Sequence, residues 1–87
     1  MKIDDVLRNV RIIDSKGHGD VEINTIAFDS RKCGEHDAFF AVRGTRVDGH
    51  DFITKAVENG AKAIVCEAFP ETLSDDVAYY LVENSAY

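Results

Sequence analysis

The chain has 87 residues, 45% of them hydrophobic, and a formal net charge of −6. This length predicts one small domain, and no apolar run approaches the ~20 residues that cross a bilayer, which argues against a membrane-spanning protein. The acidic charge argues against a nucleic-acid-binding protein, because Lys and Arg supply most of the affinity for phosphates.

The first third of the chain predicts a helix, a turn and a strand. Apolar residues recur at helical spacing from Ile3 to Val10, which predicts a short packing helix. The glycine-containing stretch 14–20 is typical of a turn. Alternating apolar and polar residues over 21–28 then predict a strand.

The middle of the chain predicts a βαβ unit. The continuous apolar run 38–43 predicts a strand that is covered on both faces and therefore lies inside the sheet. Residues 51–59 carry apolar side chains at helical spacing, and Gly60 is placed to cap that helix. The run 63–67 predicts a second buried strand, parallel to the first because a crossover helix joins them.

The last part of the chain completes the predicted fold. After Pro70 and a polar loop, residues 77–84 predict a final strand. The expected order is α-β-β-α-β-β. We therefore expect an α/β fold with a small mixed sheet of about four to five strands, flanking helices and one parallel βαβ unit. The whole chain, 1–87, is expected to be a single domain.

The segment 44–50, GTRVDGH, lies between the first strand of the βαβ unit and its helix. Open α/β sheets bind ligands at the carboxyl ends of their strands, and the N–H groups that open a helix suit an oxygen-rich ligand. The candidate ligand contacts are Thr45, Arg46 and Val47, with Gly44, Asp48 and Gly49 as supporting positions. A plain connector without a ligand is the alternative.

A second polar stretch, FDSR at 28–31, ends the strand before the βαβ unit. If that strand neighbours the first strand of the unit, the Ser30 hydroxyl and the Arg31 guanidinium approach the 44–50 segment. The planar guanidinium matches phosphate or carboxylate. The alternative is an ordinary strand-ending turn, because Asp and Ser side chains often bond the local backbone there.

Basic charge gathers around these two stretches. Residues 24–46 hold four basic groups against three acidic ones, net +1, whereas the remainder of the chain is net −7. A small anion therefore meets a locally favourable surface on an otherwise repelling molecule. The alternative is that these arginines are only solvated surface.

The residues suggest binding rather than catalysis. Ser30 has no histidine assigned beside it as a base, and the sequence contains no GxxxxGK[ST] loop for a triphosphate. Cys33 and Cys66 are too few for a disulfide framework, and with the histidines they fit no familiar zinc spacing. We expect reduced thiols, no metal and, because the N-terminus lacks an uninterrupted apolar region, a cytoplasmic protein.

Residues 28–67 resemble the N-terminal domain of the Mur ligases of peptidoglycan synthesis. The pattern consists, in order, of D-S-R, a short gap, a buried strand, G-x-x-x-D-G, a helix that begins near an aromatic residue, and G-A-x-A-I-V. At His36 the chain departs from the Gly-Asp turn usual in the family, which leaves the geometry of that turn open. The resemblance implies an α/β module that holds the UDP part of a UDP-linked muramyl peptide.

The resemblance also implies a role within a larger enzyme. The implied UDP contacts are Phe28, Ser30, Thr45, Arg46 and Val47, with Arg31 as a possible supporting residue. The parent enzyme would be an ATP-dependent amide-bond-forming ligase that uses magnesium, and its ATP-binding and C-terminal domains are absent from this sequence. The chain alone is therefore expected to be a non-catalytic fragment.

The residues within these motifs, D-S-R and VRGTRVDGH, favour one branch of the family. That branch adds meso-diaminopimelate or L-lysine to UDP-N-acetylmuramoyl-L-alanyl-D-glutamate, and its C-terminal domain selects between the two. The branch that adds D-alanyl-D-alanine is the first alternative. A free-standing interaction module whose 44–50 loop meets a protein partner is the second.

Overall fold

The computed structural model describes residues 2–8, 10–17, 21–41, 52–71 and 73–83. The helices and strands run along the chain as α1 (Ile3–Val6), β1 (Ile12–Lys16), β2 (Ile26–Ala27), the 3₁₀ helix η1 (Ser30–Lys32), β3 (Ala38–Phe40), α2 (Ile53–Glu58), β4 (Ala63–Cys66) and β5 (Ala78–Val82). None of the helices within these ranges has the length and apolar composition to span a membrane.

Five strands form one mixed sheet in the order β1-β5-β4-β3-β2. β2, β3, β4 and β5 run parallel to one another, and β1 pairs antiparallel with β5 at one edge. The predicted α/β class and the parallel βαβ unit, β3-α2-β4, are confirmed. β2 pairs with β3, so the two stretches of the predicted site do follow neighbouring strands.

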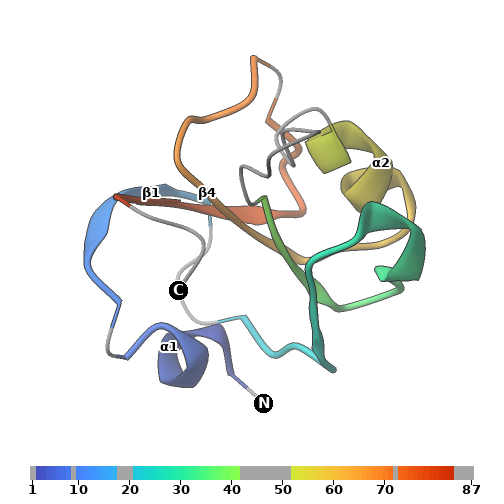
Figure 1. Ribbon diagram of the computed structural model, residues 1–87, viewed down its shortest axis with the longest axis horizontal. Coiled ribbons are helices and arrows are strands. Elements are labelled where there is room, and N and C mark those ends of the chain that lie inside the picture. Colours follow the sequence, from blue (N-terminus) through green and yellow to red (C-terminus); the bar gives the residue numbers. More distant parts are fainter. Residues whose placement is uncertain (1, 9, 18–20, 42–51, 72, 84–87) are drawn as a thin grey trace.

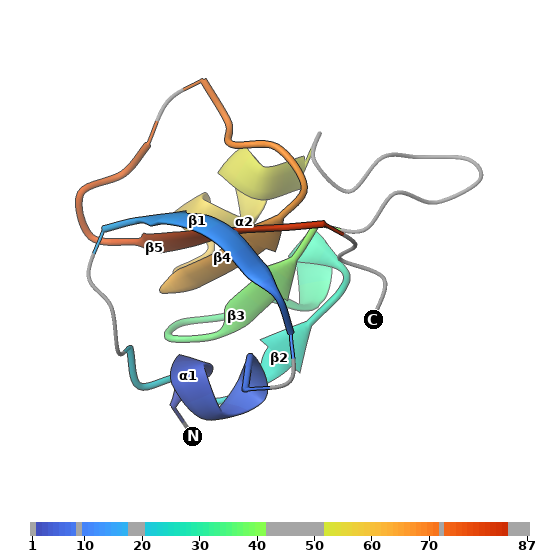
Figure 2. The ribbon, with the colours of Figure 1, turned by 90° about the vertical axis from the view of Figure 1, so that its left-hand side faces the viewer.

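Helices lie on both faces of the sheet (Figures 1 and 2), and the core has one apolar layer on each face. α2 and η1 cover one face, where Ile53 packs with Phe39, Ile64 and Tyr79. α1 covers the other face, where Ile3 packs with residues that alternate with these along the strands. Because every residue of β3 and β4 is buried, both strands read as continuous apolar runs in the sequence.

The helix α2 ends in a Schellman motif, as the placement of Gly60 predicted. Gly60 has φ +107 and donates its N–H to the carbonyl of Val57, while Ala61 donates to the carbonyl of Ala56. A side chain is rarely tolerated at this φ, which explains the glycine. The motif turns the chain directly from α2 into β4.

The segment 14–20 was predicted as a turn, and this is wrong for its first three residues. Asp14, Ser15 and Lys16 belong to β1 and pair with β5. All five residues of β1 are exposed, so no alternation of buried and exposed side chains marks the strand in the sequence. Pairing of the backbone with β5 decides its structure.

The strand predicted over 21–28 is also much shorter in the structure. Only Ile26 and Ala27 form β2. Before them Val21 accepts a hydrogen bond from the N–H of Ile3, and Glu22 forms an isolated bridge with Lys2. The alternation in the sequence arises because this segment lies against α1 before it joins the sheet.

The turn before β3 is formed by His36, where the family resemblance led us to expect a glycine. His36 has φ 64, the left-handed conformation that glycine adopts most easily. Its N–H donates to the carbonyl of Gly60 at 2.9 Å, and its carbonyl accepts from Asn24 at 2.8 Å. These two bonds hold a turn that the residue type alone disfavours.

Candidate functional site

The carboxyl ends of β2 and β3 lie side by side. The two strands pair in register, Ile26 with Ala38 and Ala27 with Phe39. The next residue, Phe28, packs its ring against Phe40, with the ring centroids 5.4 Å apart and the planes tilted by 54°. Phe28 nevertheless remains 59% exposed, so an aromatic surface faces solvent at this edge of the sheet.

After Phe28 the chain turns into η1, and Asp29 caps that turn. The Oδ1 of Asp29 accepts a hydrogen bond from the backbone N–H of Arg31 at 2.9 Å. This is the local bonding that an ordinary strand-ending turn would make. The same turn therefore serves the fold, whether or not it also meets a ligand.

The guanidinium of Arg31 is paired with Asp29 through two bonds. Nε lies 3.1 Å from Oδ1 and Nη2 lies 2.9 Å from Oδ2. The bonds from Arg31 lower the pKa of the Asp29 carboxyl to about 2, and Asp29 in turn raises the pKa of Arg31. The side chain of Arg31 is 85% exposed, so an anion that binds here must share the guanidinium with a carboxylate.

Ser30 is only 5% exposed, in contrast to the exposed residues Phe28 and Arg31. Its carbonyl accepts a hydrogen bond from Nδ2 of Asn59, the C-cap of α2, at 2.9 Å. The turn is thus anchored at the C-terminal end of α2. Because α2 has six residues, its two ends are only about 9 Å apart.

The remaining predicted contacts, Thr45, Arg46 and Val47, lie outside the described residues. The same holds for Gly44, Asp48 and Gly49. Their approach to Ser30 and Arg31 stays a prediction.

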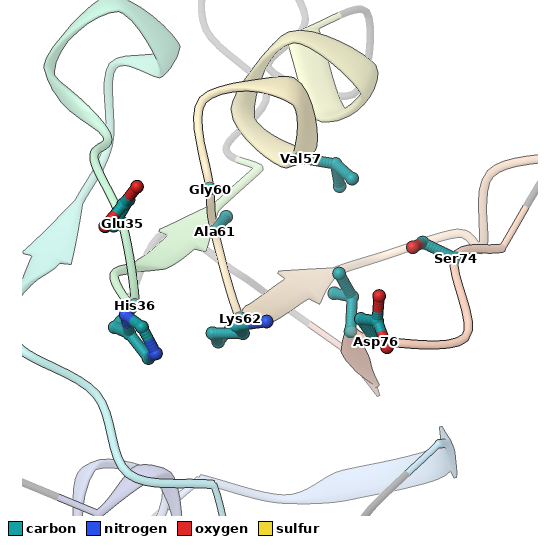
Figure 3. Close-up of a pocket in the computed structure, with 9 residues that line it drawn as sticks. Glu35, His36, Val57, Gly60, Ala61, Lys62, Ser74 and Asp76 are labelled. Carbon is teal, nitrogen blue, oxygen red and sulfur yellow. The ribbon is translucent and has the colours of Figure 1, made fainter.

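A pocket of about 320 Å³ opens at the other end of the parallel strands, where β3, β4 and β5 begin (Figure 3). His36, Lys62 and Val77 line it just before β3, β4 and β5 begin. Glu35 and Asp76 add carboxylates, and Ser74 adds a hydroxyl. This pocket could not be predicted from the sequence, because its lining comes from α2 and from separate turns that share no motif.

The two cysteines are free and buried, and neither supplies a reactive thiolate. Burial raises the pKa of the Cys33 thiol to about 11 and that of Cys66 to about 11. Both thiols are therefore protonated at neutral pH and too weak to act as nucleophiles. Cys33 instead packs in the α2-side apolar layer, where it ties η1 to the core.

Comparison with known proteins decides the family. Residues 22–85 match the family described as "Mur ligase family, catalytic domain", a stretch that includes the D-S-R turn and the whole βαβ unit. The chain belongs to the Mur ligase family.

Curated relatives of this Mur ligase chain are similar along nearly its full length. It is 42% identical over 87 residues to the UDP-N-acetylmuramoyl-L-alanyl-D-glutamate--2,6-diaminopimelate ligase of Cytophaga hutchinsonii, which covers 99% of the chain. The ligase of the same name from Phocaeicola vulgatus is 39% identical over 85 residues and covers 98%. The chain spans 18% of the length of each of these relatives.

Solved structures of Mur ligases share the fold. MurF from Acinetobacter baumannii superimposes with a TM-score of 0.65 at 29% identity, over 78% of this chain and 14% of that one. MurF from Thermotoga maritima, solved in complex with ADP, gives a TM-score of 0.63 at 44% identity, over 71% of this chain and 14% of that one. The five-stranded α/β arrangement is therefore that of the family.

Proposed function

We propose that this chain is the N-terminal, UDP-binding part of a Mur ligase that adds diaminopimelate to UDP-N-acetylmuramoyl-L-alanyl-D-glutamate. The observation that carries the proposal is the 39–42% identity, over 98–99% of the chain, to ligases whose names state that substrate. In this proposal, the longer ligase to which the chain belongs is the ATP-dependent, amide-bond-forming enzyme of cytoplasmic peptidoglycan synthesis.

The residues at the carboxyl ends of β2 and β3 have side chains of the kinds that bind nucleotides. The exposed ring of Phe28 offers a flat apolar surface to the uracil base, and stacking of a base on an aromatic ring contributes about 1–3 kcal/mol. Arg31 offers a guanidinium to the diphosphate in competition with Asp29. In the proposal, Ser30 and the backbone of 45–47 complete the contacts.

The chemistry of amide-bond formation lies outside this chain. The sequence contains no GxxxxGK[ST] loop, so we assign ATP and magnesium to the rest of the longer ligase. The role of this chain is to hold the nucleotide end of the substrate, far from the reacting carboxyl group. In the proposal this binding is the same in the ground and transition states, and uniform binding of that kind lowers KM without raising kcat.

A second candidate is the family branch called MurF, because the solved structures that superimpose carry that name. These cover 71–78% of this chain, whereas the two diaminopimelate ligases named above cover 98–99% of it. We therefore favour the diaminopimelate branch. The activity of the longer ligase with each incoming amino acid or dipeptide distinguishes the two.

The proposal is tested by titrating the 87-residue chain with UDP while backbone amide shifts are recorded. We expect saturable shifts in 28–31, with a Kd of about 0.1 mM or weaker because other domains are missing. Phe28→Ala should weaken binding at least about fivefold, through lost stacking. The matched control is Ile13→Ala, since Ile13 is equally exposed at 59% but lies on β1.

Two outcomes would contradict this proposal. The first is a titration in which 28–31 do not respond to UDP at millimolar concentration. The second is an equal loss of affinity in Phe28→Ala and Ile13→Ala. Either result would favour the alternative of an interaction module with a protein partner.

A further inference from the structure

The loop between β2 and β3 is held at two points by adjacent residues at the end of α2. Nδ2 of Asn59 donates to the carbonyl of Ser30 at 2.9 Å. The carbonyl of Gly60 accepts from the N–H of His36, also at 2.9 Å. The end of α2 thus anchors both the start and the finish of the loop that carries the D-S-R turn.

The bond from Asn59 has a longer reach than the other hydrogen bonds at this turn. Those between Asp29 and Arg31 join residues two apart, and the N–H of Cys33 donates to the Ser30 carbonyl within η1. Such local bonds keep the shape of the turn, but they move with it. The Asn59 bond spans 29 residues and fixes the backbone of the turn to α2.

The residue that Asn59 bonds is the buried residue of the turn. Ser30 is 5% exposed, whereas Phe28 is 59% exposed and the side chain of Arg31 is 85% exposed. Asn59 thus bonds the buried residue of the turn, while Phe28 and Arg31 face solvent. These are the side chains that a ligand at this edge of the sheet would meet.

We propose that Asn59 is a positioning residue for nucleotide binding, which holds the 28–31 turn in its binding conformation without touching the ligand. The inference rests on the proposed function. A turn that is in the correct place for only part of the time lowers the apparent affinity by that fraction. The ligand must otherwise supply the cost of ordering the turn.

The test is Asn59→Asp, which keeps the size of the side chain and replaces its N–H donor with an oxygen. We expect the Kd for UDP to rise about three- to tenfold, the range that corresponds to one lost hydrogen bond. In the longer ligase the same change should raise KM for the UDP-linked substrate and leave kcat unchanged. A mere loss of folded enzyme would lower kcat instead.

Asn24→Asp provides a matched control. Nδ2 of Asn24 donates to the carbonyl of Glu35 at 3.2 Å, near the far end of the same loop. The substitution, the added charge and the type of bond are the same, but the D-S-R turn keeps its anchor. We expect its Kd for UDP to equal that of the wild type.

A second variant, Asn59→Ala, removes the donor without adding charge and should weaken UDP binding similarly. Wild-type binding together with unchanged affinity in both Asn59 variants would overturn the inference alone. A wild-type chain that does not respond to UDP would overturn the proposed function and this inference with it. Variants of Asn59 that unfold outright, while Asn24→Asp stays folded, would assign Asn59 to the fold and also overturn the inference.

Discussion

At the scale of single residues, Asp29 combines a structural contact with a charge next to the candidate site. The hydrogen bonds from the side chain and backbone of Arg31 lower the pKa of the Asp29 carboxyl from 3.8 to about 2. Because this pKa lies below its value in the unfolded chain, the carboxylate stabilises the fold above about pH 3.8. That contribution is lost as the pH falls from 3.8 through about 2.

We expect Arg31→Gln to raise the pKa of Asp29 towards 3.8, but not fully, because the backbone N–H of residue 31 still donates. Carboxyl ¹³C shifts recorded between pH 1.5 and about 6 measure both midpoints. Arg8→Gln, which removes the partner of Asp5 in another exposed ion pair, should leave the Asp29 midpoint unchanged. A wild-type midpoint near 3.8 would show that the Asp29–Arg31 pair does not persist in solution.

The same residues explain how far the sequence could predict the site. The D-S-R motif predicted the turn, because its residue types form such turns and match the family pattern. It could not identify Asn59, which contacts Ser30 from 29 residues away. Nor could it reveal that Asp29 occupies the guanidinium of Arg31, since that pairing depends on side-chain geometry within the turn.

At the scale of elements, α2 depends on the left-handed residue that ends it. Gly60 has φ +107, and a Cβ added there would lie 2.8 Å from the Cα of Glu35, closer than atoms can approach. We expect Gly60→Ala to lower the free energy of unfolding by at least about 2 kcal/mol, from backbone strain and this clash. Urea denaturation followed by far-UV circular dichroism measures the change.

Gly34→Ala is the matched control, because Gly34 lies in the same loop as Glu35. A Cβ added at Gly34 would meet only the Oδ2 of Asp37 at 3.6 Å, an ordinary contact. Its effect should stay within about 0.5 kcal/mol. Equal effects of the two substitutions would show that the cap of α2 is not specially constrained.

The strands that are covered on both faces were predicted, whereas the edge strand β1 was missed and the edge strand β2 was predicted with bounds that were too long, 21–28. The runs that form β3 and β4 are fully buried, so their hydrophobic pattern follows directly from their surroundings. β1 is exposed at all five positions, and β2 has two residues. The bounds of both strands depend on backbone pairing with a neighbouring strand, which the residue pattern does not record.

At the scale of the whole molecule, one sheet separates two apolar layers, and this arrangement predicts a single unfolding transition. Ile3 lies in the α1-side layer and Ile53 in the α2-side layer, exposed by 0% and 2%. Tyr79 and Tyr80 are adjacent in β5 but point into opposite layers, the first towards α2. Their ring signals in NMR spectra therefore report on the two layers separately.

We expect Ile3→Val and Ile53→Val each to lower the free energy of unfolding by about 0.5–1.5 kcal/mol. Because the strands of the sheet contribute side chains to both layers, each variant should shift the urea midpoints of Tyr79 and Tyr80 equally. Ile13→Val, on exposed β1, should shift neither midpoint measurably. If Ile3→Val moved the midpoint of Tyr80 alone, the α1-side layer would unfold on its own, and the α2 side that carries the D-S-R turn would fold independently of it.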